Sequence, residues 1–265
     1  MVNSKSFDPL KRERRLFGHS GKDLREEMNP DIWRGNIHTG GKMFVSLGDS
    51  ELFAGVSSLV IGEVVSKARP RFFAANEAMY FMGDPITQVL LLTEGCVKKS
   101  QLSENGVEVV IRLSAPGEII SEHALGAGTK HASTAQALQD SAALAWESEI
   151  FSEALACFPV LRRNAQHILE SRLAELSGRL WEVSTKTASP RLANGLVHLL
   201  EQIGRRVDDH IEINVTQEVL GQMTALTSTE VCRQLAILKK QGIVRLQRGT
   251  IEIYSVPDLL SVSAA

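Results

Sequence analysis

The chain has 265 residues, of which 43% are hydrophobic and 23% charged, so it is long enough to form two ordinary domains, each with a buried core. Its 29 basic and 31 acidic side chains give a formal net charge of -2, which excludes a protein that binds nucleic acid through an overall positive charge. No apolar run approaches the roughly 18 residues of a membrane-spanning helix, and no signal-peptide core follows the charged start. We therefore expect a cytoplasmic protein with no membrane partner.

The three cysteines, Cys96, Cys157 and Cys232, lie far apart and form no C-x-x-C motif. We therefore expect neither a zinc site nor a closely spaced set of iron–sulfur ligands, and three free thiols suit a reducing cytosol. The sequence identifies no cofactor. His, Ser, Cys and acidic residues form no coherent catalytic set, so we do not expect an enzyme.

The first part of the chain, residues 1–48, is predicted to be a flexible N-terminal arm. Gly, Asn, Asp and Pro are frequent in it up to Gly41, and KRERR at 11–15 is a basic run. This run could contact phosphates, although a solvated tail accounts for the same residues.

Residues 49–158 are predicted to form a β-rich domain that begins with short helices. Four apolar residues of the helix from Ser57 are expected to point inward: Leu59, Val60, Val64 and Val65. Strand-like runs separated by turn residues follow, at 72–73, 79–81, 89–92, 96–102, 107–113 and 142–146. Asn105-Gly106 between two of these runs is the strongest hairpin signal. Many short strands at this spacing indicate a β-barrel or β-roll.

A long helix is predicted over residues 159–188, started by Pro159. Five apolar residues recur along it at alternating steps of four and three residues: Leu169, Leu173, Leu176, Leu180 and Val183. This spacing is typical of a coiled-coil seam and predicts a homodimer. The residues on the opposite face are charged: Arg172, Glu175, Arg179 and Glu182.

The last domain is predicted over residues 189–265, after a hinge at Ser189-Pro190, because proline restricts the preceding residue and breaks a helix. Its first helix is expected at 191–203. From residue 190 onward the chain carries eight Lys or Arg and eight Asp or Glu side chains. Any binding to DNA would therefore depend on where individual charges lie.

Two further helices and a hairpin are predicted in this domain. Thr216 can cap the first of the two helices, and Thr227 and Glu230 form a T-x-x-E capping box that opens the second, at 228–241. The second helix has an apolar face and a small or polar one, and its width fits a DNA major groove. Two strands around the turn at 247–249 complete the pattern of a winged helix. The same elements could instead be a small α+β core with no role in DNA binding.

Several motifs carry a family resemblance. In the last domain they read T-x-x-x-L-G-x-M at 216–223, L-T-x-x-x-V-x-R at 226–233, L-K-x-x-G-I at 238–243 and G-x-I-x-I-Y at 249–254. In the β-rich region they are LFAGVS at 52–57, G-D at 83–84, E-G-x-V at 94–97 and P-G-E-I-I-S-E at 116–122. With them, residues 50–256 resemble the cyclic-AMP receptor protein / fumarate-nitrate regulator (Crp/Fnr) family of bacterial transcription factors. The resemblance implies an α+β fold with an N-terminal cyclic-nucleotide-binding-type β-roll, a long dimerisation helix and a C-terminal winged helix-turn-helix.

The resemblance also implies which residues contact DNA. Family members read bases with the first, second and sixth residues of the recognition helix, which here are Ser228, Thr229 and Arg233. Arg233 matches the family's Arg and would donate to guanine O6 and N7. Thr216 and Gln217 would bond phosphate oxygens and fix the docking. A homodimer would read a pseudo-palindrome in double-stranded DNA, and RNA polymerase is a further expected partner.

The resemblance places an effector pocket in the β-roll, at positions that here carry Ser121, Glu122, His131, Ala132 and Ser177. Glu122 matches the family's Glu, which accepts from a ribose hydroxyl. His131 and Ala132, counted back from a strand at 135–138, stand where the family has an Arg-Ser pair for the cyclic phosphate. Because a phosphate pocket without its Arg loses its main charge partner, we expect an unknown small-molecule effector other than cyclic AMP. His131 could be a protonatable substitute, a metal or haem ligand, or an ordinary structural residue.

These features predict a homodimeric, sequence-specific DNA-binding transcription regulator that is controlled through the β-roll. The alternative is a signal-sensing module that acts by protein contact and binds no specific DNA.

Overall fold

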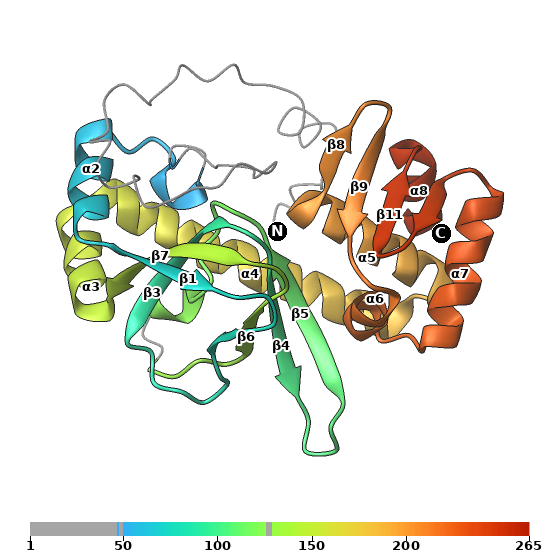
Figure 1. Cartoon of the computed structure of the whole chain (residues 1–265), viewed down its shortest axis with the longest axis horizontal. Coiled ribbons are helices and arrows are strands. Elements are labelled where there is room, and N and C mark those ends of the chain that lie inside the picture. Colours follow the sequence, from blue (N-terminus) through green and yellow to red (C-terminus); the bar gives the residue numbers. More distant parts are fainter. Residues whose placement is uncertain (1–46, 48–49, 126–128, 265) are drawn as a thin grey trace, which may run out of the picture. The chain divides into compact units, whose positions relative to one another are not determined.

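The computed structural model describes residues 47, 50–125 and 129–264 (Figure 1). The predicted arm over residues 1–48 lies outside these residues, apart from Leu47. In chain order, the described residues form a β-sheet domain, a long helix and a domain with a helix-turn-helix, so the predicted α+β fold is confirmed. None of the described helices is both long enough and apolar enough to cross a lipid bilayer.

Two antiparallel sheets form the β-roll. The first has the strand order β1-β7-β3 and consists of β1 (Arg69–Phe73), β7 (Ser141–Glu147) and β3 (Gln88–Glu94). The second has the order β2-β6-β4-β5 and consists of β2 (Ala78–Tyr80), β6 (Thr134–Ala137), β4 (Val97–Leu102) and β5 (Glu108–Ser114). Leu90 and Leu92 of the first sheet pack with Val97 and Ala135 of the second, so the two sheets enclose one core.

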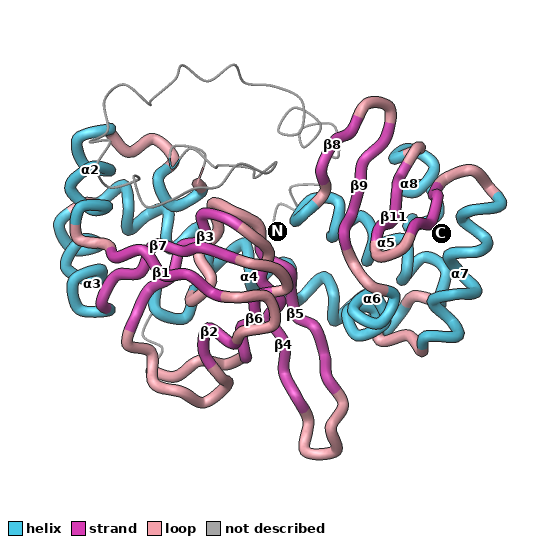
Figure 2. Tube along the Cα trace, in the orientation of Figure 1, coloured by secondary structure: helices cyan, strands magenta, loops and turns pink. Residues whose placement is uncertain are grey.

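Strands β4 and β5 form the hairpin that Asn105-Gly106 predicts, seen in Figure 2 as two long paired strands joined by a loop. Gly106 adopts a φ of 78°, which favours glycine at this turn. Lys99 lies two residues after the core residue Val97 and therefore on the same, inner face of β4. Its cross-strand partner in β5 is Arg112. The hairpin thus carries two cations on its inward face.

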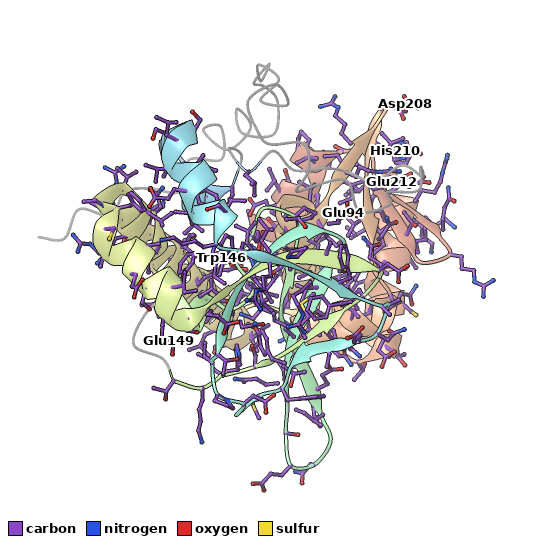
Figure 3. The ribbon with its side chains drawn as sticks, turned by 60° about the vertical axis from the view of Figure 1, so that its left-hand side comes forward. Glu94, Trp146, Glu149, Asp208, His210 and Glu212 are labelled. Carbon is purple, nitrogen blue, oxygen red and sulfur yellow. The ribbon has the colours of Figure 1, made fainter. Side chains whose placement is uncertain are left out.

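The structure corrects one core prediction. In α2 (Ser58–Ser66) the buried residues are Ile61, Val64 and Val65, whereas Leu59 is 86% exposed. Residues three and four apart share one helix face, and Leu59 lies two positions before Ile61, so its side chain points away from that face. The indole N–H of Trp146, labelled in Figure 3, donates to the carbonyl of Val64 at 2.7 Å and holds α2 against β7.

Strand β6 is a second difference, because the strand-like runs do not include it and only the resemblance points to it. Its sequence, T-A-Q-A, lacks the bulky β-branched and aromatic residues that mark strands. Ala135 and Ala137 are nevertheless fully buried between β2 and β4. Strand β6 lies between β2 and β4, and this position in the sheet accommodates small side chains.

Two helices follow the roll, α3 (Ser148–Cys157) and α4 (Pro159–Thr185). Pro159 occupies the first turn of α4, as predicted, where a missing backbone N–H costs nothing. The Asn164 amide of α4 donates to the carbonyls of Leu52 (2.9 Å) and Ala54 (2.8 Å), which fixes the helix to the short 3₁₀ turn η4 (Glu51–Phe53).

The predicted position of the hinge is wrong. The chain leaves α4 after Thr185 and enters α5 (Ala188–Ile203) after Thr187, so Pro190 lies inside the first turn of α5. The first backbone N–H groups of a helix have no intrahelical acceptor, so a proline is tolerated there and does not end the helix.

The C-terminal domain packs its helices on a four-stranded antiparallel sheet with the order β10-β11-β9-β8. Its helices after α5 are α6 (Gln217–Thr224), α7 (Ser228–Lys240) and α8 (Val256–Ala264). Its strands are β8 (Arg205–Val207), β9 (His210–Asn214), β10 (Val244–Gln247) and β11 (Thr250–Ile253). The helix predicted at 228–241 and the wing hairpin around 247–249 are confirmed, whereas the β8–β9 hairpin and α8 were not expected. Figure 3 shows Asp208, His210 and Glu212 along the β8–β9 hairpin.

Candidate nucleic-acid interface and effector site

Helices α6 and α7 are each capped at their start and are joined by a tight turn. The Thr216 hydroxyl accepts from the N–H of Val219 at 3.2 Å, and the Thr227 hydroxyl accepts from the N–H of Glu230 at 3.3 Å. In the turn, Ala225 adopts the left-handed conformation with a φ of 52°. A Cβ on Gly221 would lie 2.8 Å from the carbonyl oxygen of Leu226, so the close approach of α6 to the turn requires glycine.

Helix α7 has one buried and one exposed side. It buries four residues: Val231, Gln234, Leu235 and Leu238. The start of α6 and the exposed side of α7 present a set that we call the recognition surface: Thr216, Gln217, Ser228, Thr229, Cys232 and Arg233. The Cys232 thiol lies 2.8 Å from the side-chain oxygen of Gln217, so the two helices contribute to one continuous surface. Cys232 is exposed because it lies one position after the buried Val231.

Arg233 is held by an acidic neighbour. Its Nε and Nη2 donate to the two carboxylate oxygens of Glu230, at 3.1 and 2.6 Å. The Gln234 amide donates to the same carboxylate at 2.8 Å. These hydrogen bonds lower the pKa of Glu230. The predicted capping box is therefore only half present: Thr227 caps the helix, but the Glu230 side chain turns to Arg233 instead of the helix start.

A groove separates the start of α6 from the wing. Its lining residues are Val215, Thr216, Gln217, Leu246, Gln247, Arg248, Gly249, Thr250 and Ile251. Arg248 is exposed at the turn of the wing, beside Gly249, whose φ is 78°. The sequence marks this turn but not its role, because only the fold brings Arg248 and Thr216 to the same groove.

The effector residues predicted in the β-roll divide into buried and exposed ones. Ser121, Glu122 and His131 are buried, whereas Ala132 and Ser177 are exposed. The Ser121 hydroxyl accepts from the N–H of Leu90 at 2.8 Å. The Ser177 hydroxyl donates to a carbonyl one turn back in its own helix, at 2.9 Å.

Lys99, which the sequence did not single out, is the buried partner of Glu122. The side chains of Lys99 and Glu122 are 3% and 11% exposed, and the ammonium contacts one carboxylate oxygen. Burial, only partly offset by Glu122, lowers the pKa of Lys99. Burial opposes the ionisation of Glu122, but the charge and hydrogen bond of Lys99 outweigh it and lower the pKa of the carboxyl.

His131 stacks on Tyr80, with ring centroids 3.5 Å apart and an angle of 10° between the rings. The Tyr80 hydroxyl in turn donates to the carbonyl of Ile120 at 2.7 Å. Within the part of the chain that the structure describes, no group of three His, Cys, Asp or Glu side chains is placed to hold a metal ion. The stacking contact supports a structural role for His131.

The charged face of α4 packs inward, against β5 and the C-terminal domain. Arg112 of β5 forms ion pairs with Glu118 (2.8 Å) and Glu175. Glu175 also accepts from the Gln202 amide of α5 at 2.7 Å. Arg179 donates to the carbonyls of Val110 in β5, at 3.1 Å, and Met223 in α6, at 2.6 Å. We call Arg112, Glu175, Arg179 and Gln202 the interdomain network.

The predicted dimer seam is exposed in the single chain from its second residue onward. Leu169 is half-buried, whereas four residues are exposed: Leu173 at 67%, Leu176 at 47%, Leu180 at 70% and Val183 at 41%. Trp181, which the spacing did not select, is 59% exposed beside them. Exposed apolar stripes of this kind are typical of protein–protein contacts.

Comparison with known proteins gives two matches to family models. Residues 70–156 match the cyclic nucleotide-binding domain, and residues 190–262 match the Crp-like helix-turn-helix domain. The cyclic AMP receptor protein of Thermus thermophilus is 26% identical over 205 residues, which cover 77% of this chain and 92% of that protein. The anaerobic regulatory protein of Pasteurella multocida is 23% identical over 205 residues, which cover 77% of this chain and 74% of that protein.

Among solved structures, FixK2 from Bradyrhizobium japonicum has a similar fold, with a TM-score of 0.68 and 20% identity; the match covers 75% of this chain and 98% of that one. The two family models match successive parts of the chain, the cyclic nucleotide-binding domain first and the helix-turn-helix domain second. The chain therefore belongs to the Crp/Fnr family of transcription regulators.

Proposed function

We propose that this protein is a homodimeric regulator that binds a pseudo-palindromic DNA site through α7 and is controlled through its β-roll by an effector other than cyclic AMP. The observation that carries the proposal is the two-sided character of α7. One side of the helix is buried in its own domain, and all five residues predicted to contact DNA are exposed on the recognition surface. We further propose that it acts in the cytoplasm, on promoters served by RNA polymerase.

The contacts to DNA follow from the chemistry of the exposed groups. Arg233 hydrogen-bonds a guanine. Ser228 and Thr229, whose side chains are shorter, hydrogen-bond neighbouring bases through their hydroxyls. The Thr216 hydroxyl accepts a hydrogen bond as a helix cap and keeps its own hydrogen for a phosphate oxygen. Gln217 and Arg248, on either side of the wing groove, provide further phosphate contacts.

Dimerisation through the exposed stripe of α4 supplies the symmetry of the site. Members of the family bind DNA as dimers. A two-fold axis along α4 would place two α7 helices in successive major grooves, roughly 34 Å apart. A coiled-coil seam would cover Leu173, Leu176 and Leu180, whose exposure is otherwise unfavourable.

The proposed effector is not cyclic AMP because the charge of Glu122 and the Ser121 hydroxyl are engaged within the chain and the family's phosphate-binding arginine is absent from position 131. Glu122 contacts Lys99, and the Ser121 hydroxyl is bonded to the backbone of β3. His131 is stacked on Tyr80 where a phosphate-binding guanidinium would be needed. A cyclic nucleotide would therefore meet a carboxylate whose charge is already paired with Lys99. At residues 131 and 132 its phosphate would find His131 and Ala132 in place of the Arg-Ser pair that the family resemblance implies.

A signal in the roll can reach the DNA-binding domain through the interdomain network. Arg112 and Glu175 connect the inner face of β5 to α4, and Gln202 extends the connection to α5. An effector shifts the arrangement of these elements only if it binds one arrangement better than the other.

A second candidate function is a sensor that acts by protein contact alone. The equal numbers of basic and acidic side chains in residues 190–265 favour it, because no broad positive surface attracts DNA. The two functions differ in one measurable property, discrimination between DNA sequences.

The test is fluorescence anisotropy of the full chain, without added ligand, on DNA from upstream of its own gene. Random duplex competes at two salt concentrations. Specific binding that survives the competitor supports the function of a DNA-binding regulator. Arg233→Ala should then lower discrimination between specific and random DNA by about 5- to 150-fold while leaving the dimer intact. Weak binding that is equal for all sequences, with and without cell extract as a source of effector, would favour the protein-contact function.

A further inference from the structure

We infer that Glu230 is a positioning residue for base recognition: it holds the guanidinium of Arg233 by one edge so that the other edge faces the DNA. The inference rests on the proposed function, because it concerns the same surface. It concerns a residue whose sequence pattern indicates only a helix cap.

The contacts form a chain from the interior of the domain to its surface. Gln234 is buried, with 5% exposure, and donates to Oε1 of Glu230. The Glu230 side chain is 24% exposed, and the Arg233 side chain that it binds is 65% exposed. The backbone N–H of Glu230 is also fixed, by the Thr227 hydroxyl. The carboxylate is therefore anchored behind the guanidinium and does not itself lie foremost on the surface.

The edge that Glu230 occupies decides what Arg233 can still do. A guanidinium has five N–H donors, and Glu230 receives one from Nε and one from Nη2. The remaining hydrogens of Nη1 and Nη2 form a second, parallel pair of donors. Guanine presents O6 and N7 as two adjacent acceptors, which such a pair matches. An arginine restrained in this way loses less side-chain freedom on binding than a free one.

The same carboxylate has an opposite effect on binding that ignores sequence. Glu230 puts a negative charge beside a surface that must approach phosphates, and each neutralised phosphate contributes to the affinity for any duplex. A positioning role therefore predicts two changes of opposite sign when the charge is removed. Affinity for random duplex rises, and discrimination at the guanine falls.

A purely structural role predicts something else. Glu230 lies in the first turn of α7, where a carboxylate stabilises the helix through its dipole. If this were its only function, substitution would lower the melting temperature and leave discrimination unchanged. Glu230→Asp separates the two roles, because it keeps the charge at the helix start but is one methylene too short to hold both donors of Arg233.

The test measures anisotropy with a duplex that the wild-type protein selects from a randomised pool. A second duplex is identical except that one G·C pair is replaced by A·T. This pair, assigned to Arg233, is the one at which the Arg233→Ala protein binds the two duplexes equally well. We expect Glu230→Gln to bind random duplex about 2- to 3-fold more tightly and to lose roughly 3- to 10-fold in discrimination. Glu230→Asp should keep the melting temperature and lose discrimination.

The matched control is Glu218→Gln, which removes an exposed carboxylate from the first turn of the neighbouring helix α6. It should tighten binding to random duplex and leave discrimination unchanged. In the Arg233→Ala background, Glu230→Gln should cause no further loss of discrimination.

One outcome would overturn the inference alone: a selected duplex that Glu230→Gln and Glu230→Asp still discriminate as the wild type does. If the wild-type protein enriches no sequence from the pool, the proposed function fails, and the inference with it.

Discussion

The ammonium of Lys99 contacts the carboxylate of Glu122 inside the β-roll, and both side chains are almost completely withdrawn from solvent. The pair joins the inner face of β4 to the 3₁₀ turn η5 (Glu122–Leu125). Glu122 is the residue through which the family resemblance predicts contact with a ligand sugar. In this chain the negative charge of Glu122 is already balanced by Lys99, so the β-roll needs no ligand to compensate this buried charge.

Removal of Lys99 should therefore be costly. Lys99→Met leaves a buried carboxylate without its cation, and we expect the free energy of unfolding to fall by about 3–5 kcal/mol at pH 7. The double variant Lys99→Met/Glu122→Gln should recover most of this loss. Chemical denaturation measures both. Lys98→Met is the matched control, since Lys98 pairs with the more exposed Glu108, and a loss equal to that of Lys99→Met would contradict the account.

The pH dependence of the same variants has a definite sign. In the wild-type protein the pKa of Glu122 is lowered, so ionised Glu122 contributes stability above its unfolded pKa, and this stability is lost as the pH falls through the folded value. In Lys99→Met the lowering by Lys99 is lost, and burial is opposed only by Arg172 and a backbone hydrogen bond, so the pKa of the carboxyl rises. Protonation of the carboxyl then relieves the destabilisation caused by its burial. The difference in unfolding free energy between the two proteins should narrow from pH 7 to about pH 5. A constant difference would mean that Glu122 is not the group left unpaired.

Cyclic AMP should not stabilise this protein. A ligand at 100 times its dissociation constant stabilises a folded protein by about 2.7 kcal/mol, which shifts the melting temperature by several degrees. We expect no such shift with millimolar cyclic AMP in differential scanning fluorimetry. A saturable shift that Glu122→Gln abolishes would show that the nucleotide displaces Lys99 and would refute our assignment of the pocket.

Dimerisation should depend on the exposed stripe of α4. Leu180 is 70% exposed in the single chain, and Leu180→Glu should convert the dimer to a monomer in sedimentation equilibrium. Because one half-site is then bound without the other, operator affinity should fall by at least about 100-fold. Leu59→Glu is the control, since Leu59 is a leucine of even greater exposure, 86%, on α2. A Leu180→Glu protein that remains dimeric would place the interface elsewhere.

Arg248 should act on affinity and not on sequence preference. It lies at the wing turn beside the start of α6, so Arg248→Ala should weaken binding to all duplexes by a similar factor. The slope of log affinity against log salt should fall by about 1, as for one lost phosphate contact. Arg163→Ala, at an exposed position on α4, controls for the change in net charge. Loss of preference for one base pair would instead assign Arg248 to base reading.

The helices of this protein could be predicted from sequence where their signals are local. Thr216 and Thr227 cap the helices that they were expected to cap, and the step of the leucines along α4 is visible without any tertiary information. Pro190 shows the limit of such signals, because a proline ends a helix or starts one depending on which turn it occupies.

The contents of the β-roll could not be predicted in the same way. Alternation along β4 places Lys99 inward, but its partner Glu122 belongs to another element, and no local pattern joins them. The partners of the charged face of α4 are hidden from the sequence for the same reason: Glu175 and Arg179 bind residues of β5, α5 and α6. The contact of Glu230 with Arg233 is local, at a spacing of three residues, and helical spacing could have suggested it.

The central claim is sequence-specific DNA binding by a protein that needs no cyclic AMP. The measurement that tests it most directly is anisotropy of the ligand-free, full-length protein on DNA from upstream of its own gene, with random duplex as competitor at two salt concentrations. We predict saturable binding that resists the competitor, is unchanged by cyclic AMP and loses its sequence preference in Arg233→Ala. Binding that random duplex competes equally well, or that becomes specific only when cyclic AMP is added, would contradict the account.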